Sequence, residues 1–161
     1  MNTDQLNKLH ETLRASIVVA QEFSELLKQE KHKLTSLDRD DVTSLLEQKE
    51  LLIHQLIAYQ GKILQFCQEY KLEPNYSDIR AYLFRTGVKN AEAILQDWTI
   101  LKNALIKNQA LNKTNEAILA ELIRRNQIKQ TIIQGLGKQA DTYTAKGSTA
   151  HHSQQGWVEQ V

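Results

Sequence analysis

Side chains able to support catalysis or to bind a metal are few in this chain, and they are scattered. His10, His32 and His54 each stand alone on a predicted helix, with no cysteine or carboxylate beside them at metal-ligand spacing. His151 and His152 are adjacent, but the segment around them is polar, which favours a solvated tail over a metal site. No phosphate-binding loop, zinc pattern or nucleophile elbow is present. The sequence therefore predicts a protein that is not an enzyme and that holds no metal and no cofactor.

Two side chains allow a more specific chemical interpretation. His54 invites comparison with histidine-phosphotransfer bundles, which place a lysine and a glycine shortly after the histidine. Here His54 is followed by Gln-Leu-Ile-Ala-Tyr, so phosphotransfer is only a minor alternative. Cys67 lies on a mostly apolar face beside Phe66, which favours a small packing residue over a nucleophile. A single cysteine also excludes an internal disulfide and is consistent with a reducing cytoplasm.

The composition is typical of a soluble, cytoplasmic, all-helical protein. The 161 residues include one proline and six glycines, strand-like alternation is nearly absent, and helix-forming residues dominate. The formal net charge is +1 with basic and acidic residues interspersed, so a dedicated nucleic-acid binder is not expected. No apolar run reaches the roughly 18 residues that span a bilayer, and the N-terminus lacks the features of a signal peptide. We expect no stable membrane insertion.

Apolar periodicity predicts a hairpin of two antiparallel helices, at Asp4–Leu34 and Arg39–Tyr70. The break between them is short and Asp38 can cap the second helix, as expected for antiparallel neighbours. Lys49 occupies an otherwise apolar seam position of the second helix. In such a hairpin Lys49 would face the turn of helix that contains Leu27 and Glu30, so we expect its stem to pack and its ammonium to reach a glutamate or the rim of the bundle.

A connector and a longer third helix follow. Pro74 interrupts the second helix, a short helix is expected at Ser77–Arg85, and an unbroken helical pattern runs from Ala91 to Leu136. The third helix would be roughly 70 Å long, against roughly 45–50 Å for each of the first two, so it should extend past the hairpin or bend. We therefore predict a helical-bundle domain at residues 1–137 and a flexible C-terminal tail at residues 138–161.

Three asparagines occupy the middle of the inward seam of the third helix, namely Asn108, Asn112 and Asn115. A heptad seam normally holds apolar residues at these positions. The cluster is therefore either a device that sets helix register or a surface left available for a partner. The segment Lys107–Ala117 offers only Leu111 and alanines to a core, and packing is expected to loosen there. Four residues before it are expected in the core: Ile94, Trp98, Leu101 and Leu105.

The third helix also carries more apolar side chains than one seam requires. Those off the seam are Leu95, Ile100, Leu111, Ile118, Ile123, Ile128 and Ile132. They can face the first two helices or a second copy of the chain, or they can offer a groove to an amphipathic helix of another protein. The last interpretation favours a protein that works by holding another chain. The alternative is a coiled-coil structural or oligomerisation adaptor without a client, in which the asparagines lie inside a homodimer.

Several short motifs follow one another in a set order. They are Glu-x-Lys before paired leucines at residues 47–52, Asn-x-x-Asn before Ile-Leu at 112–119, Arg-Asn-Gln at 125–127, and Thr-Tyr-Thr-Ala-Lys-Gly at 142–147. In this order and spacing the chain resembles the FlgN family of flagellar export chaperones, which are cytoplasmic helical proteins of similar length. One departure is Glu116, which stands where the family usually has glycine.

The resemblance implies partners and residue roles. Such chaperones bind hook–filament junction proteins of the FlgK and FlgL type before export, prevent their premature association and deliver them to the type III export gate. Their C-terminal part holds the exported client, and a tail tyrosine is implicated in docking on the gate protein FlhA. By motif position this tyrosine is Tyr143. Five residues in the second half of the third helix are then the expected client contacts: Ile118, Leu122, Ile128, Ile132 and Leu136.

Overall fold

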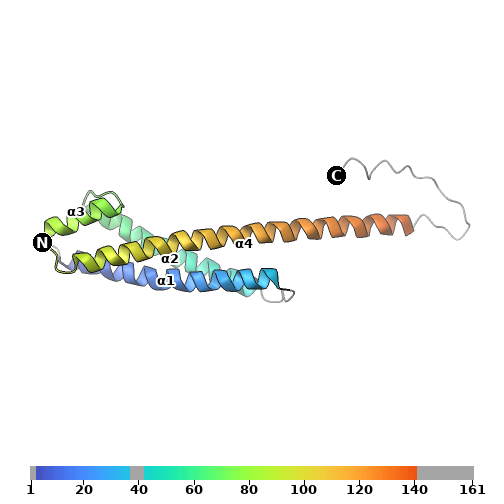
Figure 1. Ribbon diagram of the computed structural model, residues 1–161, viewed down its shortest axis with the longest axis horizontal. Helices are drawn as coiled ribbons and strands as arrows, with labels where there is room; N and C mark the ends of the chain where they lie inside the picture. Colours follow the sequence, from blue (N-terminus) through green and yellow to red (C-terminus); the bar gives the residue numbers. More distant parts are fainter. Residues whose placement is uncertain (1–2, 37–41, 141–161) are drawn as a thin grey trace, which may run out of the picture. The chain divides into compact units, whose positions relative to one another are not determined.

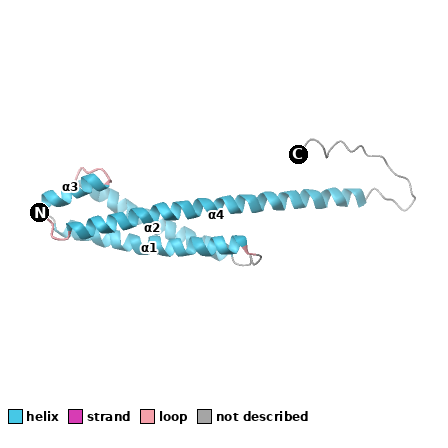
Figure 2. Ribbon diagram, in the orientation of Figure 1, coloured by secondary structure: helices cyan, strands magenta, loops and turns pink. Residues whose placement is uncertain are grey.

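The computed structural model describes residues 3–36 and 42–140. Four α-helices follow one another: α1 (Thr3–Thr35), α2 (Val42–Glu69), α3 (Tyr76–Thr86) and α4 (Ala91–Ala140) (Figure 1). The described residues contain no strand (Figure 2), so the predicted all-α fold is confirmed. In the same residues, no helix is both long enough and apolar enough to cross a membrane.

The chain divides into two compact units, unit 1 at Met1–Leu119 and unit 2 at Ala120–Val161. Helix α4 belongs partly to each unit, because the division falls within it. The division follows shortly after the asparagine-rich segment that the sequence singled out. Unit 1 holds α1, α2, α3 and the first part of α4, and both apolar clusters found among the described residues lie in it.

Helices α1 and α2 pack against each other as the predicted antiparallel hairpin (Figure 1). Glu30, near the end of α1, bonds to Lys49, near the start of α2, as expected across a short turn. Leu13 and Leu27 are fully buried and mark the inner stripe of α1. The predicted capping residue Asp38 lies outside the described residues.

Two apolar clusters form the core of unit 1. The larger joins all four helices, and its fully buried leucines and isoleucines are Leu13, Ile79, Leu83 and Ile94. The smaller lies between α1 and α2, with Leu111 of α4 packed against it, and its members are Phe23, Leu26, Leu27 and Leu45. The first part of α4 is thus the third partner of the hairpin, as predicted.

Helix α3 is a short connector with defined caps at both ends. The Oδ1 atom of Asn75 accepts a hydrogen bond of 2.9 Å from the backbone N–H of Asp78. Gly87 ends the helix in the left-handed conformation, with φ of 63°. Ile79 and Leu83, one turn apart, fix α3 to the larger cluster. The connector therefore returns the chain to the hairpin in a defined direction.

Helices α1 and α4 run parallel, with a nearly constant sequence offset between facing residues. The Nε2 atom of His10 lies 2.9 Å from Oδ2 of Asp97, and these residues are 87 apart in sequence. Two further hydrogen bonds join α4 residues to α1 residues that precede them by 88. Contacting parallel helices need a long connection, which α2 and α3 provide. The offset is thus set by the length of the chain between the two helices.

The predicted end of the last helix, at Gly135 to Gly137, is wrong. Helix α4 continues to Ala140 and so contains the predicted domain boundary at residue 137. A glycine within a helix costs about 1 kcal/mol relative to alanine but retains its backbone N–H, so it weakens a helix without stopping it. The remaining tail, residues 141–161, lies outside the described residues, and its flexibility stays a prediction.

Candidate functional site

The side chains most able to support catalysis or to bind a metal are either part of the packing or exposed to solvent. His10 contacts Asp97, and the Nδ1 atom of His10 lies 3.3 Å from the Nδ2 atom of Asn90. This histidine therefore links α1 to α4 and to the residue that precedes α4. His54 is exposed on α2. Cys67 is buried in the larger cluster, as predicted, and burial raises the pKa of its thiol. No group of three or more His, Cys, Asp or Glu that could hold a metal occurs in residues 3–36 and 42–140.

Asn108 and Asn115 are buried contacts between α4 and α1. The Nδ2 atom of Asn108 donates to the carbonyl of Ala20 over 2.7 Å, and that of Asn115 donates to the carbonyl of Leu27 over 2.8 Å. In each pair the asparagine follows its acceptor by 88 residues. The two asparagine donors of α4 are one heptad apart, and so are the two carbonyl acceptors of α1. Of the two interpretations open from the sequence, the structure supports the register device for these two asparagines.

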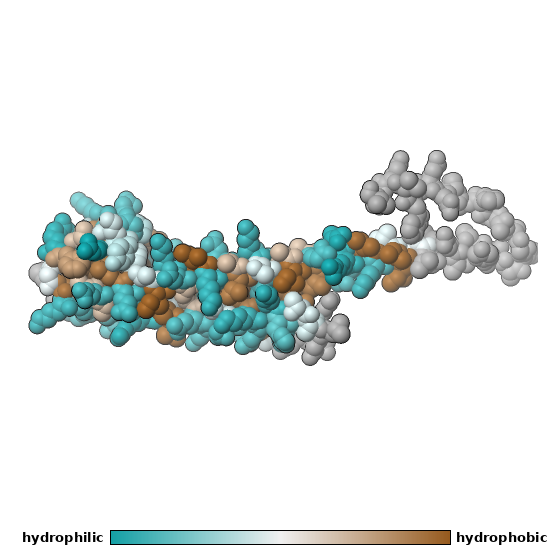
Figure 3. All heavy atoms as spheres, in the orientation of Figure 1, coloured by the Kyte–Doolittle hydropathy of each residue, from teal (hydrophilic) through white to brown (hydrophobic). Residues whose placement is uncertain are grey.

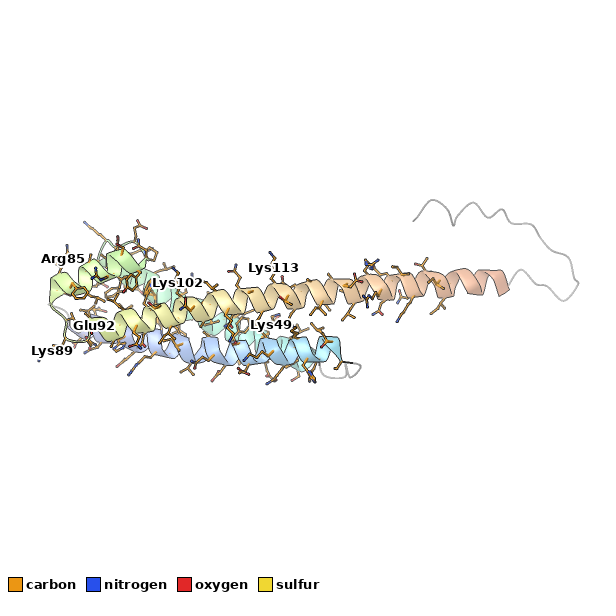
Figure 4. The ribbon with its side chains drawn as sticks, in the orientation of Figure 1. Lys49, Arg85, Lys89, Glu92, Lys102 and Lys113 are labelled. Atoms are coloured by element: carbon orange, nitrogen blue, oxygen red, sulfur yellow. The ribbon has the colours of Figure 1, made fainter. Side chains whose placement is uncertain are left out.

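Asn115 also belongs to a buried polar network that joins three helices. Its Nδ2 atom lies 2.7 Å from Oε2 of Glu30, and the Lys49 ammonium donates to both carboxylate oxygens, over 3.0 and 3.1 Å. The side chains of Lys49 and Glu30 are only 16% and 10% exposed, and Figure 4 shows Lys49 pointing into the bundle of unit 1. Of the two environments expected for the Lys49 ammonium, a glutamate or the rim, the structure shows the glutamate. Since α2 and α4 donate to one carboxylate of α1, the network holds the three helices together.

The expected loosening of packing in Lys107–Ala117 is wrong. Asn108 and Asn115 are 2% and 1% exposed, and carbonyls of α1 and the Glu30 carboxylate accept hydrogen bonds from their Nδ2 atoms. Asn112 behaves differently, since its Nδ2 atom bonds over 2.7 Å to Glu116 of the same helix. Two of the three asparagines therefore join helices, and the third does not.

Unit 1 also contains an apolar groove of about 530 Å³, bordered by α2, α4 and the segment before α3. Leu105 was predicted in the core, but it is 41% exposed and lines this groove. Ile94 and Leu101 are buried and Trp98 is half-buried against the larger cluster, as predicted. The groove was not predictable from the sequence, because periodicity identifies an apolar face without showing whether a neighbour covers it. The other lining residues are Ser16, Leu56, Gln60, Ile63, Leu64, Pro74, Asn75, Tyr76, Trp98, Leu101, Lys102, Ile106 and Gln109.

Apolar side chains beyond the asparagines stay outside both core clusters. Of the predicted client contacts, Ile128 and Ile132 are 45% and 43% exposed, and Ile118 and Leu122 are half-buried. Two of the five predicted residues are thus exposed on α4 and two are half-buried, and their contact with a client stays a prediction. Further exposed apolar residues of α4 beyond the asparagines are Leu119, Ile123 and Ile133.

The side chains of two predicted functional residues lie outside those that the structure describes. Leu136 lies within α4, but its side chain is outside those that the structure describes. Tyr143 lies outside the described residues altogether. The assignments of both residues stay predictions.

A compact group of charges accompanies the exposed apolar residues of unit 2. The Glu121 carboxylate accepts hydrogen bonds from two nitrogens of Arg124, each over 2.9 Å, and from Nε of Arg125 over 2.8 Å. These guanidinium groups lower the pKa of Glu121 from 4.5 to about 2. In Figure 3, hydrophilic atoms lie between apolar ones along the part of α4 nearest the grey residues. This part of α4 is therefore a mixed apolar and basic surface.

Comparison with known families identifies the chain. A family model described as FlgN protein matches residues 1–151. The chain belongs to the FlgN family. FlgN proteins are flagellar export chaperones, so the role of the protein is that of a chaperone in flagellum assembly. No curated protein and no solved structure matched the chain.

The geometry gives physical meaning to the Asn-x-x-Asn motif of this FlgN chain. Its second asparagine, Asn115, is the one that joins α4 to Leu27 and Glu30 of α1. Glu116, in the position where the family usually has glycine, is exposed and accepts a hydrogen bond from Asn112. A side chain at position 116 is therefore accommodated without disturbing the helix.

Proposed function

We propose that this FlgN protein is a cytoplasmic chaperone that binds hook–filament junction proteins of the FlgK and FlgL type through the second half of α4. In this proposal it prevents the terminal helices of those proteins from associating before export, and it delivers them to the export-gate protein FlhA. The observation that carries the proposal is the run of exposed apolar side chains on α4, from Leu119 to Ile133, outside both core clusters.

The physical reason is the recognition of one amphipathic helix by another. The exposed apolar side chains include two pairs four residues apart, Leu119 with Ile123 and Ile128 with Ile132. Side chains four residues apart are neighbours on a helix surface, and a client helix can bury such a pair with its own apolar face. Contiguous exposed apolar surface on a soluble protein commonly marks an interaction site. The client would thereby keep its own apolar face away from other junction proteins.

Client capture tests the proposal. The purified chain and its Ile128→Ala/Ile132→Ala variant are each mixed with FlgK-type and FlgL-type proteins, and bound protein is measured by pull-down and calorimetry. We expect the double variant to weaken binding by tenfold or more, since each truncation removes up to about 2 kcal/mol of buried apolar contact.

A matched control variant is Leu51→Ala/Ile57→Ala, which truncates two exposed apolar residues of α2, at 60% and 59% exposure. It should leave client binding nearly unchanged. Failure of the unaltered chain to bind either junction protein would remove the proposed function. An equal loss in both variants would show that the surface lies elsewhere or is not specific.

Gate docking is assigned to Tyr143, following the family motif. Replacing Tyr143 with alanine should weaken binding to FlhA and leave client binding nearly normal, because an aromatic side chain in a polar segment can act as a single anchor. Phenylalanine at the same position separates the ring from its hydroxyl. Loss of client binding together with gate docking would assign Tyr143 a structural role instead.

The alternative of a client-free coiled-coil adaptor has lost its main support. It placed the asparagine seam inside a dimer, whereas Asn108 and Asn115 bond within their own chain. Sedimentation at micromolar concentration still separates the two functions, since a stable homodimer without client affinity would favour the adaptor. We propose that the protein catalyses no phosphotransfer. Incubation of the chain with a small phosphodonor tests this, because His54 should stay unphosphorylated.

A further inference from the structure

Unit 2 presents a helical seam whose middle is basic. Steps of three and four residues along α4 align positions 122, 125, 129 and 132, which hold Leu, Arg, Lys and Ile. The Arg125 side chain is 65% exposed and Lys129 is also exposed. A helix that covers this seam therefore meets apolar residues towards its two ends and two cations between them.

The local carboxylate offsets only part of this charge. Glu121 pairs with Arg124 and Arg125, whereas the Lys129 ammonium has no ion pair or hydrogen bond within the described part of the chain. Residues 120–140 contain one acidic and four basic residues, while residues 91–119 contain three of each. The excess of positive charge is thus confined to the second half of α4.

A second copy of the chain is a poor occupant of this seam. Parallel pairing in register would stack Arg125 on Arg125 and Lys129 on Lys129. Antiparallel pairing centred on position 129 would again bring Lys129 against Lys129. Like charges at facing seam positions disfavour association, so the pattern that invites a partner helix also discriminates against the chain itself.

We infer that the client segment docking on this seam is an amphipathic helix that carries carboxylates between its apolar layers, opposite Arg125 and Lys129. Covering Lys129 with a purely apolar helix would desolvate an unpaired ammonium, which is strongly unfavourable. A glutamate or aspartate at the facing position offsets that desolvation, while the flanking Leu122 and Ile132 are buried by apolar residues of the client. The inference rests on the proposed function for the existence of a client, and on the seam for its chemistry.

Two synthetic helices with the same apolar pattern test the inference. One carries glutamate and the other lysine at the two central seam positions, and each is titrated against the full chain by fluorescence anisotropy. We expect the glutamate peptide to bind about tenfold more tightly than the lysine peptide, because reversing both charges converts attraction into repulsion. The Lys129→Glu variant should lose most of this preference.

The matched control is Lys113→Glu, at an exposed lysine of α4 in unit 1 that is labelled in Figure 4. It should leave the preference unchanged, and circular dichroism should show equal helix content in both variants. Equal affinity for the two peptides, absence of binding to either, or equal effects of the two variants would each overturn the inference. So would a Lys129-dependent affinity for duplex DNA or anionic vesicles that exceeds the affinity for the glutamate peptide.

The same variants separate this inference from the proposed function. Junction proteins that bind the Lys129→Glu variant as tightly as the unaltered chain would overturn the inference and leave the export-chaperone function intact. A glutamate peptide that binds with the expected preference, when junction proteins do not bind at all, would support the seam chemistry and remove the proposed clients.

Discussion

The two halves of α4 are built from the same residue types but are used differently. In the first half, Ile94 and Leu101 are 0% and 7% exposed and pack in the larger core cluster. In the second half, Ile128, Ile132 and Ile133 are 43% to 67% exposed. Neither propensity nor composition accounts for this difference, since both halves form continuous helix. The difference lies in their contacts: Ile94 and Leu101 pack with other helices of unit 1, whereas Ile128, Ile132 and Ile133 belong to neither core cluster.

The polar residues of the two halves differ in the same way. Asn108 and Asn115 find their partners on α1 of the same chain. Arg125 pairs only within its own helix, with Glu121, and Lys129 pairs with no described residue. Buried polar groups with partners specify a structure, whereas exposed ones without partners are available for recognition. The asparagine segment therefore belongs to the scaffold, and the available surface begins after it.

The largest expected effect comes from truncating one isoleucine in each half. Ile94→Ala should lower the free energy of unfolding by about 2–5 kcal/mol, because it removes a fully buried side chain and leaves a cavity. Ile133→Ala, at 67% exposure, should change it by less than about 0.5 kcal/mol. Urea denaturation followed by circular dichroism measures both. Equal losses of stability would show that the second half of α4 has a buried partner within the monomer.

A smaller effect is expected from the asparagines. Asn115→Ala removes the donors to Leu27 and Glu30 and should lower the free energy of unfolding by about 1–3 kcal/mol. Asn112→Ala is a matched control on the same helix, since alanine favours helix equally at both positions and Asn112 bonds only to Glu116. Its stability should stay within about 0.5 kcal/mol of the unaltered chain. A similar loss at position 112 would contradict a specific role for Asn115.

The smallest expected effect is the pH dependence of the Glu121 ion pairs in the second half of α4. The pKa of Glu121 is lowered from 4.5 to about 2, so its pairing with Arg124 and Arg125 contributes fully above pH 4.5 and is lost as the pH falls through about 2. Carboxyl chemical shifts of Glu121 in an NMR titration should show this low midpoint. Glu121→Gln should remove this pH-dependent contribution to the stability of α4. A midpoint near 4.5 would show that the ion pairs do not form in solution.

Most of the fold could be predicted from local patterns. Pro74 and Gly87 mark the connector helix, and the apolar seams mark the three long helices. The contact between Lys49 and Glu30 was also predictable, because a short turn in an antiparallel hairpin determines which residues face each other. These features depend on residues close in sequence or on one turn of known length.

Two of the errors concern partners that are distant in sequence, and one concerns the end of a helix. Nothing near Asn115 indicates that a carbonyl 88 residues earlier accepts its hydrogen bond, so a polar segment was mistaken for a loosely packed one. Leu105 continues the apolar seam, yet it faces a groove. The helix end was misplaced because Gly135 and Gly137 weaken a helix without terminating it. The exposure of Ile128 and Ile132 agrees with the predicted surface, and their contact with a client stays a prediction.

The matched spacing of donors on α4 and acceptors on α1 restricts how the length of this protein can change. One residue inserted between Asn108 and Asn115 would rotate the second asparagine by about 100° away from α1. An insertion between Ala20 and Leu27 would move the acceptor in the same way. Length changes among FlgN chains should therefore occur outside these two segments, or as whole heptads added to both helices at once. The hydrogen bonds of Asn108 and Asn115 thus predict where insertions and deletions in the family can occur.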